Sequence, residues 1–134
     1  LSVSGAVIVS TPQQVALIDA KKGIEMFNKV GIPVIGMVEN MATHICSNCG
    51  QEESIFGAHG TQVMAEEYGI PILASLPLDA RIREDVDQGI PTVAADPTGA
   101  LSSAYITLGH QVAAHLWLRN RQADAPPAIM MMSD

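Results

Sequence analysis

The sequence predicts an α/β fold with three layers, in which helices flank a mainly parallel sheet. Short apolar runs rich in β-branched residues alternate along the chain with segments whose apolar residues recur every three or four positions. Runs of the first kind are typical of strands buried on both faces, and the second spacing is typical of the helices that cover them. Apolar residues make up 48% of the 134 positions, which is enough to form a hydrophobic core.

The first three elements form a βαβ unit. The run at 5–10 predicts a strand, and the run at 34–38 predicts a second strand that is parallel to the first. The helix between them carries one apolar stripe, formed by Leu17, Ala20, Ile24 and Phe27. Thr11 and Gln14 fit a capping box at the start of this helix, and Gly31 fits its end.

The second half of the chain predicts one more strand and several helices. A short helix over 60–69 precedes a strand over 71–76, and Asp79 can cap a helix that ends at Gln88. The segment 91–93 predicts a short extended piece. Thr98 then fits the N-cap of a long final helix. The apolar stripe of that helix comprises Leu101, Tyr105, Leu108, Val112 and Leu116.

Three strands make a thin sheet for a fold whose sheet is covered on both faces, so we expect further strands to precede Leu1 in a longer protein. Residues 1–121 are predicted to form the carboxyl-terminal part of that larger domain. Residues 122–134, which include two adjacent prolines, are predicted to form a flexible tail.

Composition excludes several classes of partner. Seven Lys and Arg against fourteen Asp and Glu give a formal charge of −7, and an acidic surface repels nucleic acid. No apolar run reaches the roughly 18 residues that a membrane-spanning helix needs, so we expect no membrane partner. Two cysteines are too few for a disulfide framework, and we therefore expect a protein of the reducing cytoplasm.

The long polar loop predicted over 39–59 holds the strongest chemical signal, the pair Cys46 and Cys49. Two thiolates at this spacing can ligate one metal centre, but zinc and iron–sulfur sites normally take four protein ligands. His44 and His59 could complete a zinc site, or a second copy of the chain could supply its own pair of thiols. The pair could instead form a thioredoxin-like dithiol or remain two unreactive thiols in a loop.

Polar residues also follow two of the predicted strands, at the edge where open α/β sheets bind ligands. Asn40 follows the second strand, and its side-chain amide can match the donor and acceptor edge of adenine. Pro77 and Asp79 follow the third strand, where a turn and an N-cap are the simpler interpretation of Asp79. The sequence contains neither GxxxxGK[ST] nor GxGxxG, so it predicts no phosphate site and no catalytic residue.

Several of these segments resemble one known family. The runs GAVIVSTPQ, VENM, HICSNCG, LPLDARIRED and GIPTV resemble the carboxyl half of the Mrp/ApbC proteins, over about residues 3–118. The resemblance implies the MinD/ParA-like P-loop ATPase fold and a homodimer that bridges a 4Fe–4S cluster through Cys46 and Cys49 of each chain. It also implies binding of ATP with magnesium. Asn40 matches the residue that contacts adenine, and Pro77 and Asp79 match the segment that lines the base.

The family's phosphate-binding loop and switch segments have no counterpart in this sequence. The expected function is that of an iron–sulfur cluster carrier, which passes a labile cluster to apo iron–sulfur proteins. ATP hydrolysis is expected of the complete protein and not of this chain alone. A zinc-binding interaction module without enzymatic activity is the alternative. A MinD/ParA-type positioning ATPase is a further possibility, although such a protein has no need of the paired cysteines.

Overall fold

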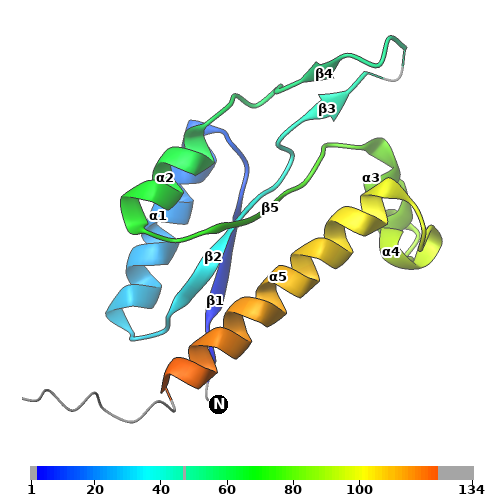
Figure 1. The fold of residues 1–134 in the computed structure, drawn as a ribbon. Helices are drawn as coiled ribbons and strands as arrows, with labels where there is room; N and C mark the ends of the chain where they lie inside the picture. The colour runs from blue at the N-terminus through cyan, green and yellow to red at the C-terminus, as the bar shows by residue number, and fades with distance from the viewer. Residues whose placement is uncertain (1–2, 47, 124–134) are drawn as a thin grey trace, which may run out of the picture.

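The computed structural model describes residues 3–46 and 48–123 and confirms the predicted α/β fold (Figure 1). One sheet has the strand order β1-β2-β5, with β1 at Ala6–Ser10, β2 at Val34–Glu39 and β5 at Ile72–Ser75. Both pairings are parallel, and the register places Ile8 opposite Met37 and Val38 opposite Ala74. Strand β2 is therefore the central strand, and its apolar run reflects burial on both faces.

Helices α1 (Gln14–Lys29) and α2 (Gly60–Tyr68) cover one face of this sheet (Figure 1). The core on this side consists of Ile8, Leu17, Ala20, Ile24, Val34, Met37, Met64 and Ala65. The apolar stripe predicted for the first helix is confirmed, because three of its members are buried there and Phe27 packs against them. Gly60 begins α2 where a side chain would collide with α1, since an added Cβ would lie 2.6 Å from Leu17 Cδ1.

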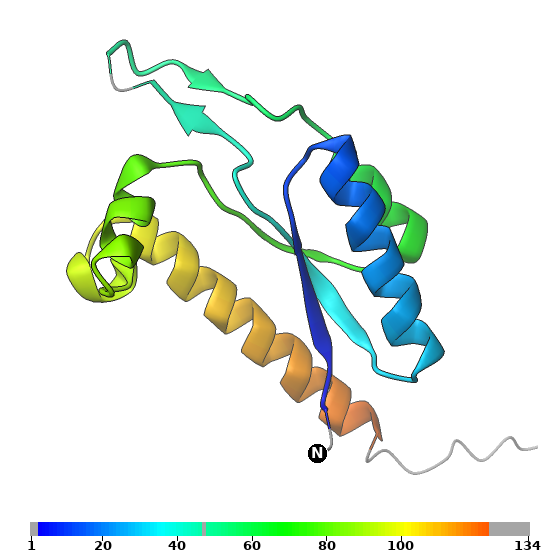
Figure 2. The ribbon, with the colours of Figure 1, turned by 180° about the vertical axis from the view of Figure 1, so that it is seen from behind.

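Helix α5 (Ala100–Ala123) crosses the opposite face of the sheet, so the molecule has three layers (Figure 2). The core on this side joins Ile35, Val38, Leu73 and Leu76 to Tyr105, Leu108, Val112 and Leu116 of the helix. Successive residues of a strand point to opposite faces, which is why Met37 and Val38 are both almost fully buried, each in a different cluster.

The predicted loop over 39–59 is not irregular throughout. It contains a short antiparallel hairpin of β3 (His44–Ile45) and β4 (Glu52–Glu53), which extends away from the main sheet (Figures 1 and 2). Hydrogen bonds between the main chains of β3 and β4 stabilise this hairpin. The sequence did not indicate these strands, because it has no alternation of apolar and polar residues there. We refer to residues 44–53 as the cysteine hairpin.

The prediction of an extended piece over 91–93 is wrong. The chain forms a short helix there, α4 (Thr92–Ala95). The carbonyl of Pro91 accepts from the N–H groups of Ala94 and Ala95, which closes a helical turn. The Ser102 hydroxyl of α5 lies 2.5 Å from the Asp96 carbonyl and 3.1 Å from the Thr92 carbonyl, so it contacts acceptors at both ends of this short helix. Helix α3 (Ala80–Asp87) precedes it, and Asp79 is its N-cap as predicted.

Two helices begin later than the sequence predicts. Helix α1 starts at Gln14, because the Thr11 hydroxyl donates to the Gln13 side chain at 3.2 Å and caps no helical N–H. Helix α5 starts at Ala100. The first helical hydrogen bond runs from Ser103 N–H to the Gly99 carbonyl, so Gly99 and not Thr98 is the residue that precedes the helix.

The described part of α5 continues to Ala123, past the predicted boundary at residue 121. The rest of the predicted tail, 124–134, lies outside the described residues. Among the helices that the structure describes, none combines the length and the apolar character needed to cross a bilayer.

Candidate functional site

The cysteine hairpin presents both thiols on a tight turn between its two strands. Across the turn, Cys46 N–H donates to the Gln51 carbonyl at 2.9 Å, and Gly50 N–H donates to the Cys46 carbonyl at 2.8 Å. Gly50 has a φ of 72°, a left-handed conformation that glycine adopts without strain and that reverses the chain directly after Cys49. The two cysteines thus lie at one end of the hairpin, where Cys46 is partly exposed and Cys49 is exposed.

The turn also favours the thiolate form of Cys46. Backbone N–H groups of Cys49 and Asn48, together with the Cys49 thiol, hydrogen bond to the Cys46 sulfur and lower its pKa below the ordinary value of a cysteine. The thiolate is the form that acts as a nucleophile and as a metal ligand. Exposure and a lowered pKa therefore make Cys46 a suitable ligand for a metal centre that approaches from solvent.

The two histidines considered as zinc ligands have other positions. His44 is the first residue of β3, and its Nδ1 lies 3.1 Å from the carbonyl oxygen of Leu78. His59 occupies the N-cap of α2 with a φ of 69°. Over residues 3–46 and 48–123, no three side chains of His, Cys, Asp or Glu gather closely enough to hold a metal ion. The structure thus does not assemble the zinc site in which these histidines complete the pair of thiols.

A second site lies at the carboxyl end of the sheet, where the structure brings Asn40, Pro77 and Asp79 together in one cavity of about 250 Å³. We refer to it as the sheet-edge cavity. Asn40 is held by two contacts: its N–H donates to the Ser10 carbonyl at 2.7 Å, and its Oδ1 accepts from Met41 N–H at 3.1 Å. Further lining residues are Met41, Leu78, Ile82, Arg83, Val86, Asp87 and Tyr105.

The sequence did not identify the walls that α3 and α5 supply to this cavity. Ile82 and Val86 come from α3, and Tyr105 comes from the buried stripe of α5. Burial raises the pKa of the Tyr105 hydroxyl, so it stays protonated and can donate a hydrogen bond. The only signal for Tyr105 in the sequence is its place in an apolar stripe, which predicts packing and not the lining of a cavity.

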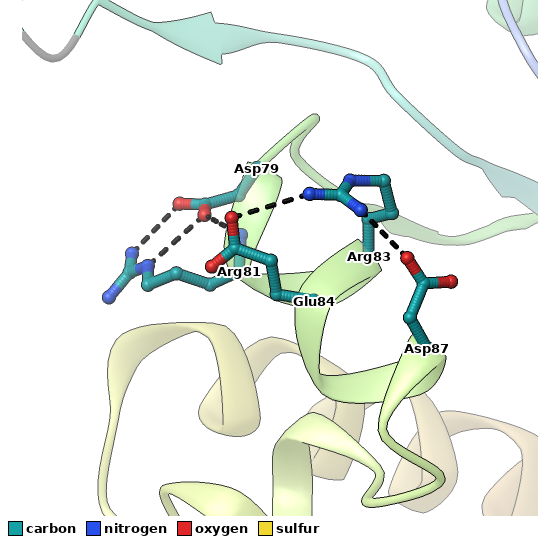
Figure 3. A network of polar contacts seen from close by, with 5 residues as sticks. All are labelled: Asp79, Arg81, Arg83, Glu84 and Asp87. Carbon is teal, nitrogen blue, oxygen red and sulfur yellow. Dashed lines mark hydrogen bonds and ion pairs between the residues drawn. The ribbon is translucent and has the colours of Figure 1, made fainter.

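Asp79 caps α3 and is paired with Arg81, as Figure 3 shows. Its Oδ1 accepts from Arg81 N–H at 2.9 Å, and the guanidinium contacts the same carboxylate at 2.8 and 3.1 Å. The hydrogen bonds from Arg81 hold the pKa of Asp79 below its usual value. Nearby, Arg83 pairs with Asp87 at 2.7 Å and more loosely with Glu84 at 3.4 Å. The simpler interpretation of Asp79, a turn followed by an N-cap, is confirmed.

Comparison with known proteins places this chain in one family. Residues 1–113 match the ParA family model described as "NUBPL iron-transfer P-loop NTPase". The chain belongs to this family. The family resemblance predicted from the sequence is thereby confirmed.

Among curated relatives of this NUBPL-type chain, the iron-sulfur cluster carrier protein of Haemophilus influenzae is 52% identical over 117 residues. That match covers 87% of this chain and 32% of the relative. The mouse iron-sulfur cluster transfer protein NUBPL is 43% identical over 116 residues, which cover 87% of this chain and 36% of the relative. The chain thus spans about a third of the length of the curated relatives it matches.

Solved structures confirm the P-loop NTPase-like fold. The Pyrococcus furiosus cell division ATPase MinD aligns with a TM-score of 0.65 and 25% identity, over 83% of this chain and 43% of MinD. A nucleotide-binding protein from Archaeoglobus fulgidus, solved in complex with ADP, aligns with a TM-score of 0.55 and 37% identity. The latter match covers 64% of this chain and 35% of that protein.

Proposed function

We propose that this protein is an iron–sulfur cluster carrier whose cargo is held by Cys46 and Cys49. The observation that carries the proposal is the turn of the cysteine hairpin, where two exposed or partly exposed thiols lie together and backbone N–H groups favour the thiolate of Cys46. The names of the curated relatives, which are carrier and transfer proteins for iron–sulfur clusters, support it.

The number of ligands favours a homodimer. A 4Fe–4S cluster takes four thiolates, and this chain has two cysteines, so two chains related by a two-fold axis would supply a complete set. The donor set fits such a shared cluster, because Cys49 is exposed and Cys46 is partly exposed. We therefore propose a cluster of the 4Fe–4S type, bridged between two copies of the chain.

Transfer from such a site is an exchange of ligands. A thiol of an apo iron–sulfur protein loses its proton and bonds to an iron atom, while the bond from that iron to Cys46 or Cys49 breaks. The released cysteine thiolate then takes up a proton, and no iron atom changes its oxidation state. Exposed ligands allow an acceptor to replace them one at a time, which suits a carrier of the cytoplasm better than a permanent cluster site.

We further propose that the sheet-edge cavity receives the adenine base of ATP in a protein of the relatives' full length. The side-chain amide of Asn40 can hydrogen bond to a base edge, and the apolar side chains of Ile82 and Val86 suit a flat aromatic ring. Pro77 and Asp79 line the same cavity. ATP bound with magnesium would supply the phosphoryl group that is hydrolysed. This chain contains no phosphate-binding loop to hold that group.

Anaerobic reconstitution with iron and sulfide tests the carrier proposal. We expect two iron atoms per chain, which corresponds to one four-iron cluster per two chains. Cys46→Ala and Cys49→Ala should each abolish the cluster and the dimer that depends on it, whereas Ser54→Ala, just after the hairpin, should retain both. Iron and sulfide analysis with sedimentation measures the outcome. A full cluster on a monomer would contradict the bridged arrangement, and zinc bound without sulfide would favour the interaction module.

A further inference from the structure

The cysteine hairpin is tied at its base to the segment between β5 and α3. Leu78 N–H donates to the Thr43 carbonyl at 2.7 Å, and His44 Nδ1–H donates to the Leu78 carbonyl at 3.1 Å. Both main-chain polar groups of Leu78 therefore hydrogen bond to residues at the start of β3. Figure 1 shows the segment running past the base of the hairpin, whose far end projects away from the sheet.

The same segment forms a wall of the sheet-edge cavity. Pro77, Leu78 and Asp79 all line that cavity beside Asn40. Asp79 also borders a separate cavity of about 500 Å³ together with His44, Cys46 and other residues at the base of the hairpin. Asp79 thus lines both cavities, and Leu78 joins the wall of the proposed base site to the start of the cysteine hairpin through its main chain.

We propose that His44 is a positioning residue that links the sheet-edge cavity to Cys46, so that a nucleotide in the cavity slows release of the cluster. The inference rests on the proposed function, because it needs both the cluster and the nucleotide. It goes beyond that function by assigning a role to His44 and a path by which the two ligands affect each other. Such coupling requires that the nucleotide stabilise one arrangement of a shared element, which here is the segment 76–79.

The physical argument has two steps. A nucleotide adds contacts to Pro77, Leu78 and Asp79 and restricts the segment that carries the Leu78 carbonyl. The hydrogen bond to that carbonyl then holds the ring of His44, which lies two residues before Cys46 on the same strand. Because the bond from iron to Cys46 breaks more readily when the hairpin can move, a more firmly held hairpin exchanges its cluster more slowly.

Substitution at His44 can separate this role from a merely structural one. His44→Phe retains a ring and removes the donor, while the main-chain bond between Leu78 and Thr43 remains. His44→Asn restores an amide nitrogen close to the position of Nδ1. His110→Leu, an exposed change on α5, is the control. One neutral hydrogen bond changes an equilibrium by about threefold to tenfold, which sets the scale of the expected effect.

The experiment uses protein of the relatives' full length, loaded anaerobically, with a small apo-ferredoxin as the acceptor and circular dichroism as the readout. Magnesium ADP should slow transfer about fivefold in the unaltered protein, in His44→Asn and in His110→Leu. In His44→Phe the nucleotide should change the rate less than about twofold, with iron content and nucleotide affinity unchanged. Iron content and calorimetric affinity are measured for every variant.

The outcomes are distinct. A nucleotide response in His44→Phe equal to that of the unaltered protein overturns the inference, and so does the absence of any response in an unaltered protein that binds both ligands. Loss of cluster loading in a folded His44→Phe assigns His44 a structural role and overturns it as well. If His44→Phe does not fold, His44→Ala replaces it under the same criteria. Failure of the unaltered protein to bind cluster or nucleotide refutes the proposed function itself, and the inference with it.

Discussion

Replacing Asp79 with alanine removes the side chain that begins α3, and we expect it to destabilise the protein by about 1 kcal/mol. Its Oδ1 accepts from Arg81 N–H at 2.9 Å, which satisfies one of the N–H groups that the first turn of a helix leaves without a partner. Alanine offers no acceptor there. For a chain of this size, the loss corresponds to a decrease of about 3–5 °C in the melting temperature.

Asp79→Asn separates the cap from the charge. Asparagine is as good an N-cap as aspartate, but it loses the ion pair with Arg81. The Arg81 side chain is 66% exposed, so water screens that pair and its contribution is small. We therefore expect Asp79→Asn to lose less than half of the stability that Asp79→Ala loses.

The dependence on pH follows from the lowered pKa of Asp79. A carboxyl whose pKa is lower in the folded state than in the unfolded chain stabilises the fold fully above the unfolded value, about 3.9. That stabilisation is lost as the pH falls through the folded value. The difference between the unaltered protein and Asp79→Asn should thus be constant near pH 7 and decrease below about pH 4.

Urea denaturation, followed by far-ultraviolet circular dichroism at pH 7 and at a series of acidic pH values, measures these differences. Asp85→Ala, which removes a partly exposed carboxylate from the same helix, is the matched control and should stay close to the unaltered protein. Equal losses in Asp79→Asn and Asp79→Ala at pH 7 would show that the charge, and not the cap, carries the effect. An Asp79→Ala variant as stable as the unaltered protein would refute the reasoning altogether.

Two further predictions concern the sites. In the cluster-free chain, iodoacetamide should alkylate Cys46 at a lower pH than it alkylates N-acetylcysteine, and Cys49→Ala should keep most of this shift because the backbone donors remain. An unshifted pH profile, measured by mass spectrometry, would contradict the account of the turn. In a protein of the relatives' full length, Asn40→Ala should weaken ATP about tenfold and leave pyrophosphate nearly unchanged. Equal losses for both ligands in calorimetry would exclude a contact between Asn40 and the base.

The sequence predicts well those elements in which the pattern of apolar residues follows the buried face. The apolar run of β2 predicts a strand covered on both faces, and the structure buries Met37 and Val38 in different clusters. The stripe of α5 predicts its packed face for the same reason, because Leu108 and Val112 recur at the helical period and meet the sheet. Periodic burial leaves a signal in every turn of a helix and every second residue of a strand.

The elements that the sequence predicts poorly depend on hydrogen bonds between distant residues. The two-residue strands of the cysteine hairpin carry no apolar alternation, and the bond from Cys46 N–H to Gln51 is not visible in composition. The carbonyls at the two ends of α4 likewise contact the hydroxyl of Ser102 on α5. The same limit applies to the sheet-edge cavity, where Asn40 was predicted from its place after a strand but Tyr105 could be placed only by the packing of α5.

The proximity of the two sites follows from strand pairing. Strands β2 and β5 are parallel neighbours, so the segments that leave their carboxyl ends start side by side. The ladder continues beyond them, since Leu76 N–H donates to the Glu39 carbonyl and Ala42 N–H donates to the Leu76 carbonyl. Leu78 extends the same sequence of bonds to Thr43. Any arrangement of the chain that keeps this register must bring Asn40, the segment 77–79 and the start of the cysteine hairpin together, whatever ligands they bind.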